Sequence, residues 1–452
     1  MSNFIFYDLE TTGTNIVFDQ IMQFGAVLTD RNLVELDRFE IRCRLLPWIV
    51  PAPGALLVTD TDVRLLDDPT LPDFYSMMRA IAQQLNAWGR ATFVGYNSIP
   101  FDEPFLQRAF WQALLPPYVT VTGGNSRLDL LVILRAASTF RSSVLIVPHR
   151  DDGMPTYRLD VLAPFNGFNA HHAHDAMGDV EATLFLARKL KTGFSELWEK
   201  LSGRASKSVI SSLLDAGEPL FLFHHGAKPS LSCYYRVDDG RLRSHATLAR
   251  LSFDWKGASI LSVDNSGAMR QMLRRVALNK APVVLTLEEA ENFASVMPTD
   301  LELAQASFLA SDRSYCADLA ELLEPLSASP TANGAQVEET IFDGFASNCD
   351  AKLMAEFHRA APPEQLEIAK AFEDVRFRRL AMRILYVQAP QILTLRETRP
   401  IDAGIARRLE GEPGGQPWRS LGDARKELTS CSSKMSSEAK QSISNWLAER
   451  AV

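Results

Sequence analysis

Two acidic residues one position apart, Asp8 and Glu10, are the first residues of this chain that could do chemistry. They end an apolar stretch at residues 3–10 that predicts a β-strand. Side chains two positions apart in a strand point to the same face, so both carboxylates would share one pocket and repel each other unless a cation lies between them. Hard oxygen ligands favour magnesium or manganese. The alternative is a strand end with two solvated acids.

A third acid, Asp102, follows a short apolar segment at residues 91–97 and precedes a helical pattern that runs through residues 105–113. The spacing predicts a buried strand that leads directly into a helix. Aspartate is also a favoured helix N-cap, so a capping role for Asp102 is the alternative interpretation.

A fourth acid, Asp179, starts an apolar stripe at helical spacing, which predicts a helix that packs on the sheet and aims this carboxylate at the first strand. His174 lies five residues earlier, and an imidazole accepts protons readily near neutral pH. There are two alternatives for this region. In the first, the histidines lie on the surface: His171, His172 and His174. In the second, they form a zinc site together with Asp175.

The elements that must position these residues can be predicted from periodicity. Residues 21–30 and 33–45 predict two more strands, and an antiparallel meander with the first strand is the simplest arrangement. Amphipathic helices are predicted at residues 73–88 and 125–138, the second entered through Asn125 and Ser126, and a turn followed by a helix at 151–167.

Composition bounds the rest. A chain of 452 residues with 46% apolar and 23% charged residues is expected to form about three domains of a globular protein. It shows no signal peptide and no membrane-spanning stretch, so a cytoplasmic location is the default. The five cysteines are far apart and match no CxxC pattern, and we expect them to be reduced, with no structural zinc.

Charge is distributed unevenly along the chain. The net charge is -8, but residues 201–280 carry +6 and the remainder therefore -14. An acidic catalytic part joined to a basic middle fits a metal-dependent enzyme acting on a polyanion, whereas a solvated surface is the simpler alternative. β-rich runs at 219–225, 232–239 and 257–264 predict a small antiparallel barrel there. Three aromatic residues of this part could stack on bases or lie in the core: Tyr234, Tyr235 and Trp255. We expect at least one of the two tyrosines to lie in the core.

The C-terminal part is predicted to be helical. Residues 326–336 resemble a linker, and helical periodicity is clear at 351–358, 365–386 and 438–452. Four arginines form a basic cluster on one of these helices, some facing solvent and some available for phosphates: Arg376, Arg378, Arg379 and Arg383.

The ordered set of motifs is similar to that of one nuclease family. Residues 8–13 (DLETTG), 95–102 (GYNSIPFD) and the pair His174 and Asp179 resemble the DEDDh exonucleases of the ribonuclease H-like fold. Five longer segments resemble bacterial exonuclease I: residues 53–62, 125–136, 151–162, 174–183 and 341–354.

The resemblance implies an α/β architecture. It consists of a ribonuclease H-like exonuclease domain with a mixed sheet at 1–198, a small basic barrel similar to Src-homology-3 domains at 199–330 and an α-helical domain at 331–452. Two departures put strand grip and processivity in doubt. Residues 387–397 lack the expected arginines and asparagines, and Leu128 stands where an aromatic residue is expected.

The resemblance also implies a site and an activity. Two magnesium ions, replaceable by manganese, would be held by four carboxylates: Asp8, Glu10, Asp102 and Asp179. His174 would be the general base. Further residues would contact substrate: Thr11, Asn97, Arg127 and Arg158. The expected activity is 3′ to 5′ hydrolysis of single-stranded DNA to 5′-mononucleotides in repair or recombination. The expected enzyme is a monomer that contacts single-stranded-DNA-binding protein and no membrane. Alternatives are an exoribonuclease or proofreading-type nuclease with the same site, and a catalytically silent nucleic-acid-binding scaffold.

Overall fold

The structure is a computed structural model. It describes residues 3–169, 175–226, 228–240, 244–257, 271–323, 336–412 and 415–450. Within these ranges, no helix is long and apolar enough to cross a membrane, and all five cysteines are free.

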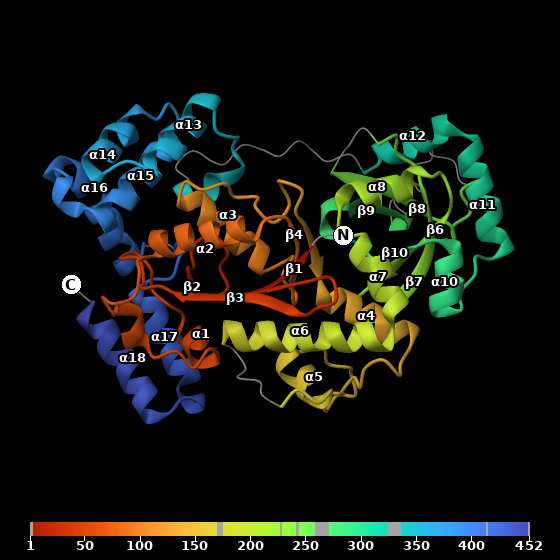
Figure 1. The fold of residues 1–452 in the computed structure, drawn as a ribbon, viewed down its shortest axis with the longest axis horizontal. Coiled ribbons are helices and arrows are strands. Elements are labelled where there is room, and N and C mark those ends of the chain that lie inside the picture. Colours follow the sequence, from red (N-terminus) through yellow and green to blue (C-terminus); the bar gives the residue numbers. More distant parts are fainter. Residues whose placement is uncertain are drawn as a thin grey trace.

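A mixed five-stranded sheet forms the N-terminal part, with strand order β3-β2-β1-β4-β5 (Figure 1). Its strands are β1 (Asn3–Thr11), β2 (Ile21–Thr29), β3 (Glu35–Arg42), β4 (Ala91–Gly95) and β5 (Ser126–Asp129). The first three strands pair antiparallel, which confirms the predicted meander, whereas β4 runs parallel to both β1 and β5. Strand β1 therefore lies at the centre, where its carboxyl end meets that of β4.

Alternation along β1 divides the apolar side chains between two cores. Ile5, Tyr7 and Leu9 share one core with α2 (Phe74–Trp88) and α3 (Asp102–Gln112). Phe4 and Phe6 share the other core with α4 (Leu130–Phe140), α5 (Leu159–Phe165) and α6 (Ala176–Gly193). The sheet is thus covered by helices on both faces, and two short elements, α1 (Pro53–Val58) and η1 (Val63–Asp67), follow β3.

One predicted helix begins later than expected. We predicted a helix over residues 125–138, but Ser126–Asp129 is strand β5 and the helix starts at Leu130. Residues 127–129 are all buried because they pair with β4 inside the sheet. Asp129 then caps the helix by accepting a hydrogen bond from the Leu131 amide at 3.1 Å. The apolar Leu128 extended the helical pattern backwards into the strand.

The middle part contains an antiparallel sheet of order β10-β6-β7-β8-β9. The elements are α7 (Ser195–Gly203), α8 (Lys207–Asp215), β6 (Leu220–His224), β7 (Ser230–Arg236), β8 (His245–Arg250), β9 (Leu273–Ala277), η2 (Leu278–Lys280), β10 (Val284–Leu285), α10 (Leu287–Ala294), α11 (Asp300–Ser311) and α12 (Arg313–Glu321). Tyr234 and Trp255 are core residues, as expected for at least one of the tyrosines, and Tyr235 is partly exposed. The strand predicted at 257–264 lies outside the described residues except for Gly257.

The C-terminal part is helical, as predicted. It comprises η3 (Val337–Phe342), α13 (Asn348–Phe357), α14 (Pro362–Ala371), α15 (Val375–Gln388), η4 (Pro390–Ile392), α16 (Leu395–Glu410), α17 (Leu421–Cys431), η5 (Ser432–Lys434) and α18 (Ser437–Glu449). The single run predicted at 365–386 is divided between α14 and α15, and the predicted linker lies outside the described residues except for Gln336. In Figure 1, α13–α16 lie above α2 and α3, while α17 and α18 lie beside α1.

Candidate active site

Three carboxylates meet at the carboxyl end of β1. Asp8 and Glu10 share the face of the strand that carries Phe4 and Phe6, the face covered by α6. Carboxylate oxygens of Asp8, Glu10 and Asp179 all lie within 4.8 Å of one another. The structure therefore brings together the two acids of the first strand and the acid predicted on the later helix.

Helix α6 reaches the strand because β2 has a glycine at the point of contact. Gly25 pairs with Asp8 across the β1–β2 ladder. A Cβ atom on Gly25 would lie 2.9 Å from the backbone atoms C of Ala176 and N of Met177. The close approach of helix and sheet carries Asp179, in the first turn of α6, towards Asp8.

Polar contacts fix the start of α6 on the sheet. Asp175 is its N-cap and accepts a hydrogen bond from the Gly178 amide at 3.2 Å. The same carboxylate accepts from Gln23 Nε2 at 2.9 Å and pairs with Arg42 Nη2 at 2.6 Å. Helix α6 thus has little freedom to slide, and the position of Asp179 follows from this anchoring.

The fourth predicted acid, Asp102, is the first residue of α3 and is buried. It is not part of the close group of three, but its charge contributes to raising the pKa of Asp8, so it belongs to the same electrostatic cluster. The loop before it is held by Asp129, which accepts from the Asn97 amide at 3.0 Å. The predicted substrate residue Asn97 sits there with a φ of 58°.

Burial and mutual repulsion disfavour ionisation of these acids. Burial is the largest cause that raises the pKa of Asp8 and of Asp102 well above the usual range, and neighbouring carboxylates add to it. Burial, then Asp179 and Asp175, raise the pKa of Glu10 to about 8. The cluster offers only hard carboxylate oxygens, and a bound divalent cation would allow all of them to ionise. The residues present therefore fit a magnesium or manganese site.

The remaining predicted residues are placed differently from one another. His174 lies outside the described residues, as do His171 and His172. Thr11 is buried and donates to the Gly13 carbonyl at 2.7 Å. Arg158 is exposed and pairs with Asp160 at 2.7 Å.

The predicted substrate residue Arg127 lies inside the protein. The side chain is buried and pairs with Glu103 Oε2 at 2.7 Å, while its Nε donates to the carbonyl of Asn279 at 2.9 Å. These two contacts hold the guanidinium inside the protein and join β5 to α3 and to the middle part of the chain. The sequence showed only a basic residue in an apolar segment and gave no sign of these distant partners.

Glu103 was not singled out as a functional residue from the sequence, yet it organises the side of the site next to Asp102. It is buried and accepts hydrogen bonds from Tyr7 Oη at 2.8 Å and from Thr120 Oγ1 at 2.7 Å, in addition to Arg127. Tyr7 directly precedes Asp8 in the chain, and Glu103 itself directly follows Asp102. The only available signal was an acidic residue at the start of a predicted helix, which is common at helix N-termini.

Comparison with known proteins agrees with this geometry. Residues 5–186 match the family described as Exonuclease, and residues 335–449 match the Exonuclease I C-terminal domain. Exodeoxyribonuclease I of Haemophilus influenzae is 28% identical over 414 residues, which cover 83% of this chain and 84% of that protein.

Solved structures show the same fold. Escherichia coli exonuclease I in complex with a dA16 oligonucleotide matches with a TM-score of 0.83 at 22% identity over 100% of both chains. A structure of SSB/Exonuclease I in complex with inhibitor CFAM matches with a TM-score of 0.81 at 22% identity, again over 100% of both chains. The likeness confirms the predicted ribonuclease H-like exonuclease fold.

Proposed function

The chain belongs to the exonuclease I family and is a nuclease, and from this premise we propose that it removes nucleotides from the 3′ end of single-stranded DNA. The observation that carries the proposal is the group formed by Asp8, Glu10 and Asp179, whose carboxylate oxygens lie within 4.8 Å of one another. Such a group of carboxylates is costly to ionise unless it holds metal, so the nuclease activity of the protein would depend on divalent cations.

We propose magnesium as the physiological ion, with manganese as a substitute, held by Asp8, Glu10, Asp102 and Asp179. Two bound ions would supply an activated water and stabilise the charge that develops on the departing 3′ oxygen. The four carboxylates belong to three regular elements: β1, the start of α3 and the first turn of α6. Because these elements are anchored, the carboxylates need little rearrangement when substrate binds.

The protein's own residues would handle the proton. We propose that His174 accepts the proton of the attacking water, because an imidazole is neutral and basic enough near pH 7. The new bond joins the water oxygen to phosphorus, and the bond from phosphorus to the 3′ oxygen of the preceding nucleotide breaks. The product then leaves as a 5′-mononucleotide, and the strand ends in a new 3′ hydroxyl.

Further parts of the proposal follow from the relatives and the composition. We propose that the domains span residues 1–198, 199–330 and 331–452. The middle domain would form a barrel similar to Src-homology-3 domains and bind the strand through its excess positive charge. Four further residues are proposed to contact substrate: Thr11, Asn97, Arg127 and Arg158. We also propose contact with single-stranded-DNA-binding protein, a role in DNA repair and a cytoplasmic location.

The test is degradation of 5′-labelled oligonucleotides of one sequence, as single-stranded DNA, single-stranded RNA and recessed duplex. We expect wild type to shorten single-stranded DNA stepwise from the 3′ end, with complete loss of activity in chelator. Asp8→Asn, which keeps the side-chain shape and removes the charge, should lose about a thousandfold in rate. Asp68→Asn, on a partly exposed carboxyl in the segment after η1, is the matched control and should match wild type.

Other outcomes have definite meanings. Faster degradation of RNA than of DNA would assign the protein to exoribonucleases. Binding of single-stranded DNA by wild type without cleavage in magnesium or manganese would make it a binding scaffold and refute the nuclease proposal.

A further inference from the structure

The loop at residues 12–20, called the site loop here, connects the acidic end of β1 to β2. It begins two residues after Glu10 and is closed by its own hydrogen bonds. Thr12 Oγ1 donates to Asp19 Oδ1 at 3.1 Å and accepts from the Gln20 amide at 2.8 Å. Asp19 Oδ2 accepts from the Asn15 amide at 2.8 Å. Asp19 therefore fixes the shape of the loop that follows Glu10 in the chain.

Residues about four hundred positions later in the chain contact the same loop from outside. Arg419 Nη1 lies 3.3 Å from Asp19 Oδ1, and Asn15 Nδ2 donates to the carbonyl of Pro417 at 2.7 Å. The ring of Trp418 packs edge-on against Phe18 with centroids 5.8 Å apart. The Asp19 side chain is 5% exposed and that of Arg419 is 22% exposed, so this ion pair is largely shielded from water.

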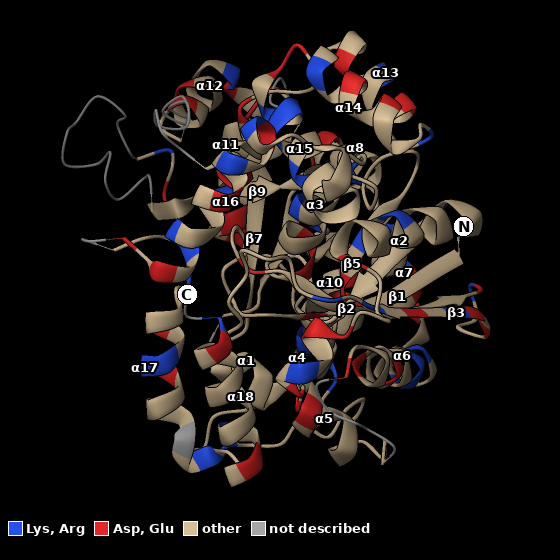
Figure 2. Cartoon of the chain, turned by 90° about the vertical axis from the view of Figure 1, so that its left-hand side faces the viewer, with Lys and Arg blue, Asp and Glu red and all other residues tan. Residues whose placement is uncertain are grey.

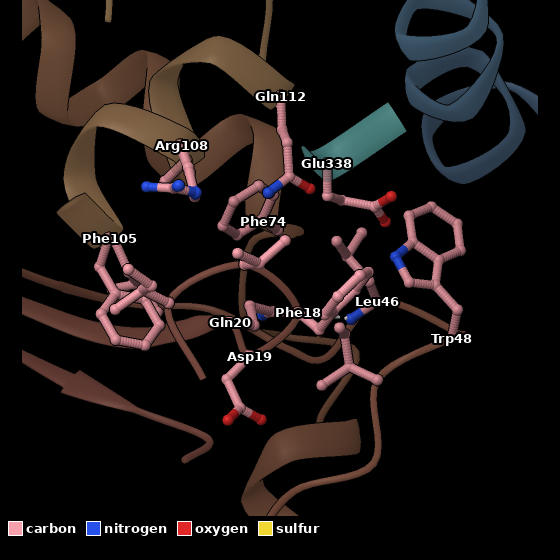
Figure 3. Close-up of a pocket in the computed structure, with 15 residues that line it drawn as sticks. Phe18, Asp19, Gln20, Leu46, Trp48, Phe74, Phe105, Arg108, Gln112 and Glu338 are labelled. Atoms are coloured by element: carbon pink, nitrogen blue, oxygen red, sulfur yellow. Dashed lines mark hydrogen bonds between the residues drawn. The ribbon is translucent and has the colours of Figure 1, made fainter. Parts of the chain in front are cut away.

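The inner side of the loop is seated in the protein. Figure 3 shows Phe18 and Gln20 among Leu46, Trp48 and Glu338, with the carboxylate of Asp19 pointing the other way. Gln20 Oε1 also accepts a hydrogen bond from the Leu46 amide at 2.9 Å. The loop is thus fixed through Phe18 and Gln20 on one side and through Asp19 on the other.

Gly13 transmits the position of the ion pair to the catalytic strand. A Cβ atom at Gly13 would overlap the carboxylate of Asp19 and would lie 3.0 Å from Arg419 Nη1. The backbone of Gly13, three residues after Glu10, therefore packs directly against the Asp19–Arg419 pair. Any displacement of that pair would move the turn that follows the carboxylate.

Arg419 is itself anchored. Its Nε pairs with Glu427 Oε2 on α17 at 3.2 Å, and Glu427 Oε1 accepts from the Gly54 amide at the start of α1 at 3.0 Å. One guanidinium therefore joins the site loop, α17 and, through Glu427, α1. This is a connection between fixed elements and not a free surface charge.

We propose that Arg419 is a positioning residue of the nuclease reaction, which holds the site loop, and through it Glu10, in the place where divalent cations bind. The inference rests on the proposed function. It gives the C-terminal helical part a role in the chemistry itself, in addition to any role in holding the strand.

The test compares Arg419→Ala and Arg419→Lys with Arg450→Ala in the full chain. Arg450 is a matched control because it also joins the C-terminal part to the N-terminal part, by pairing with Asp67, and its side chain is 24% exposed. Three quantities are measured: hydrogen exchange of the amides at 12–20, the dissociation constant of Mn²⁺ by calorimetry, and kcat and KM on single-stranded DNA.

For Arg419→Ala we expect about tenfold faster exchange at 12–20, about fivefold weaker Mn²⁺ binding, and about tenfold lower kcat with unchanged KM, because misplacement of a reacting group lowers the rate more than substrate affinity. Arg419→Lys keeps a charge that reaches Asp19 and should recover most of each loss. Arg450→Ala should leave all three quantities as in wild type.

Unchanged exchange at 12–20 and unchanged Mn²⁺ affinity in Arg419→Ala would overturn the proposal, and so would a change in KM alone, since that identifies a DNA contact. Equal effects in Arg450→Ala would reduce the role to general stability. If wild type binds Mn²⁺ but cleaves no nucleic acid, the proposed function fails, while the exchange and calorimetry data still decide the role of Arg419.

Discussion

At the scale of single residues, the candidate site holds an electrostatic conflict. Burial and neighbouring acids hold the pKa of Asp8 and Asp102 far above the usual range and raise that of Glu10 to about 8. Without a cation, the folded protein must therefore keep protons on the cluster or tolerate repulsion. This conflict is the physical reason for the metal requirement, and it makes the stability of the metal-free protein depend on pH.

The stability of the metal-free protein should fall as pH rises from 5 to 8. Folding raises the pKa of Glu10 from 4.5 to about 8, so the folded state binds this proton more tightly than the unfolded state does. The resulting stabilisation is fully present below pH 4.5 and is lost as pH rises towards the folded pKa of about 8. Glu10→Gln has no proton to lose and should be the more stable variant at pH 8, by roughly 2–4 kcal/mol.

Calorimetric unfolding in chelator at several pH values measures this difference. Glu356→Gln, at an exposed position of α13, serves as the control and should follow wild type. Manganese should raise the unfolding temperature of wild type at pH 8 more than that of Glu10→Gln. Parallel pH profiles for wild type and Glu10→Gln would show that Glu10 is not the residue that titrates.

At the scale of elements, local patterns predicted which segments form helices and strands but not how closely they approach. The period-two spacing of Asp8 and Glu10 was sufficient to place them in one pocket, because a strand fixes the direction of its side chains. The start of β5 was missed because pairing with β4 overrode a helical apolar pattern. The pair of Arg127 and Glu103 was missed because no local pattern records a contact across 24 residues.

The contact between β2 and α6 should not tolerate a side chain at Gly25. In Gly25→Ala the new Cβ would lie 2.9 Å from backbone atoms of Ala176 and Met177, which cannot rotate away. Helix α6 must shift, and Asp179 shifts with it. We expect a loss of about 1–3 kcal/mol in unfolding free energy, measured by urea denaturation, and a marked drop in kcat.

Gly404→Ala is the contrasting variant. Gly404 lies inside α16, and a Cβ there would meet no atom within 4 Å. Alanine should raise stability by roughly 0.5–1 kcal/mol, since glycine is a poor helix former.

Full activity in Gly25→Ala would contradict the first of these two predictions. It would show that the sheet and α6 can adapt without moving the acids.

Helix α15 carries the basic cluster predicted from sequence, but the cluster is divided. Arg376 pairs with Asp374 at 2.7 Å and Arg383 with Glu338 at 2.7 Å, so both stabilise the fold. Arg378 and Arg379 are exposed and line a groove with Arg396 of α16, and both helices carry basic segments in Figure 2. This second group is available to bind phosphates.

The double variant Arg379→Glu, Arg396→Glu should bind single-stranded DNA more weakly and with a shallower dependence on salt. Each lost phosphate contact is expected to reduce the slope of log affinity against log salt by about 1. Fluorescence anisotropy at several salt concentrations, with the Asp8→Asn background to prevent cleavage, gives both quantities. Arg359→Glu, exposed at the end of α13, is the control. An unchanged slope would remove this groove from the path of the strand.

At the scale of the whole molecule, hydrophobic cores cross the limits of the predicted domains. One core contains residues of β1, β2, α2 and α3 together with Phe377, Leu421 and Trp446 of the C-terminal helices. A second core joins the other face of the first sheet to the middle part. A third, with Ile210 and Leu248, belongs to the middle part alone. Composition predicted three domains, but it could not show which of their apolar faces are shared.

Shared cores predict that the N-terminal and C-terminal parts unfold together. Trp446→Ala removes a side chain that is 4% exposed in the common core and should cost about 3–5 kcal/mol. Amides of β1 and α2 should then lose as much protection from hydrogen exchange as amides of α18, although they lie far from Trp446 in sequence. Leu248→Ala, in the separate third core, should reduce protection chiefly in the second sheet. If Trp446→Ala affects only residues 336–450, the C-terminal part is an independent unit that docks on a finished domain, and the grip of Arg419 on the site loop would then depend on docking and not on folding.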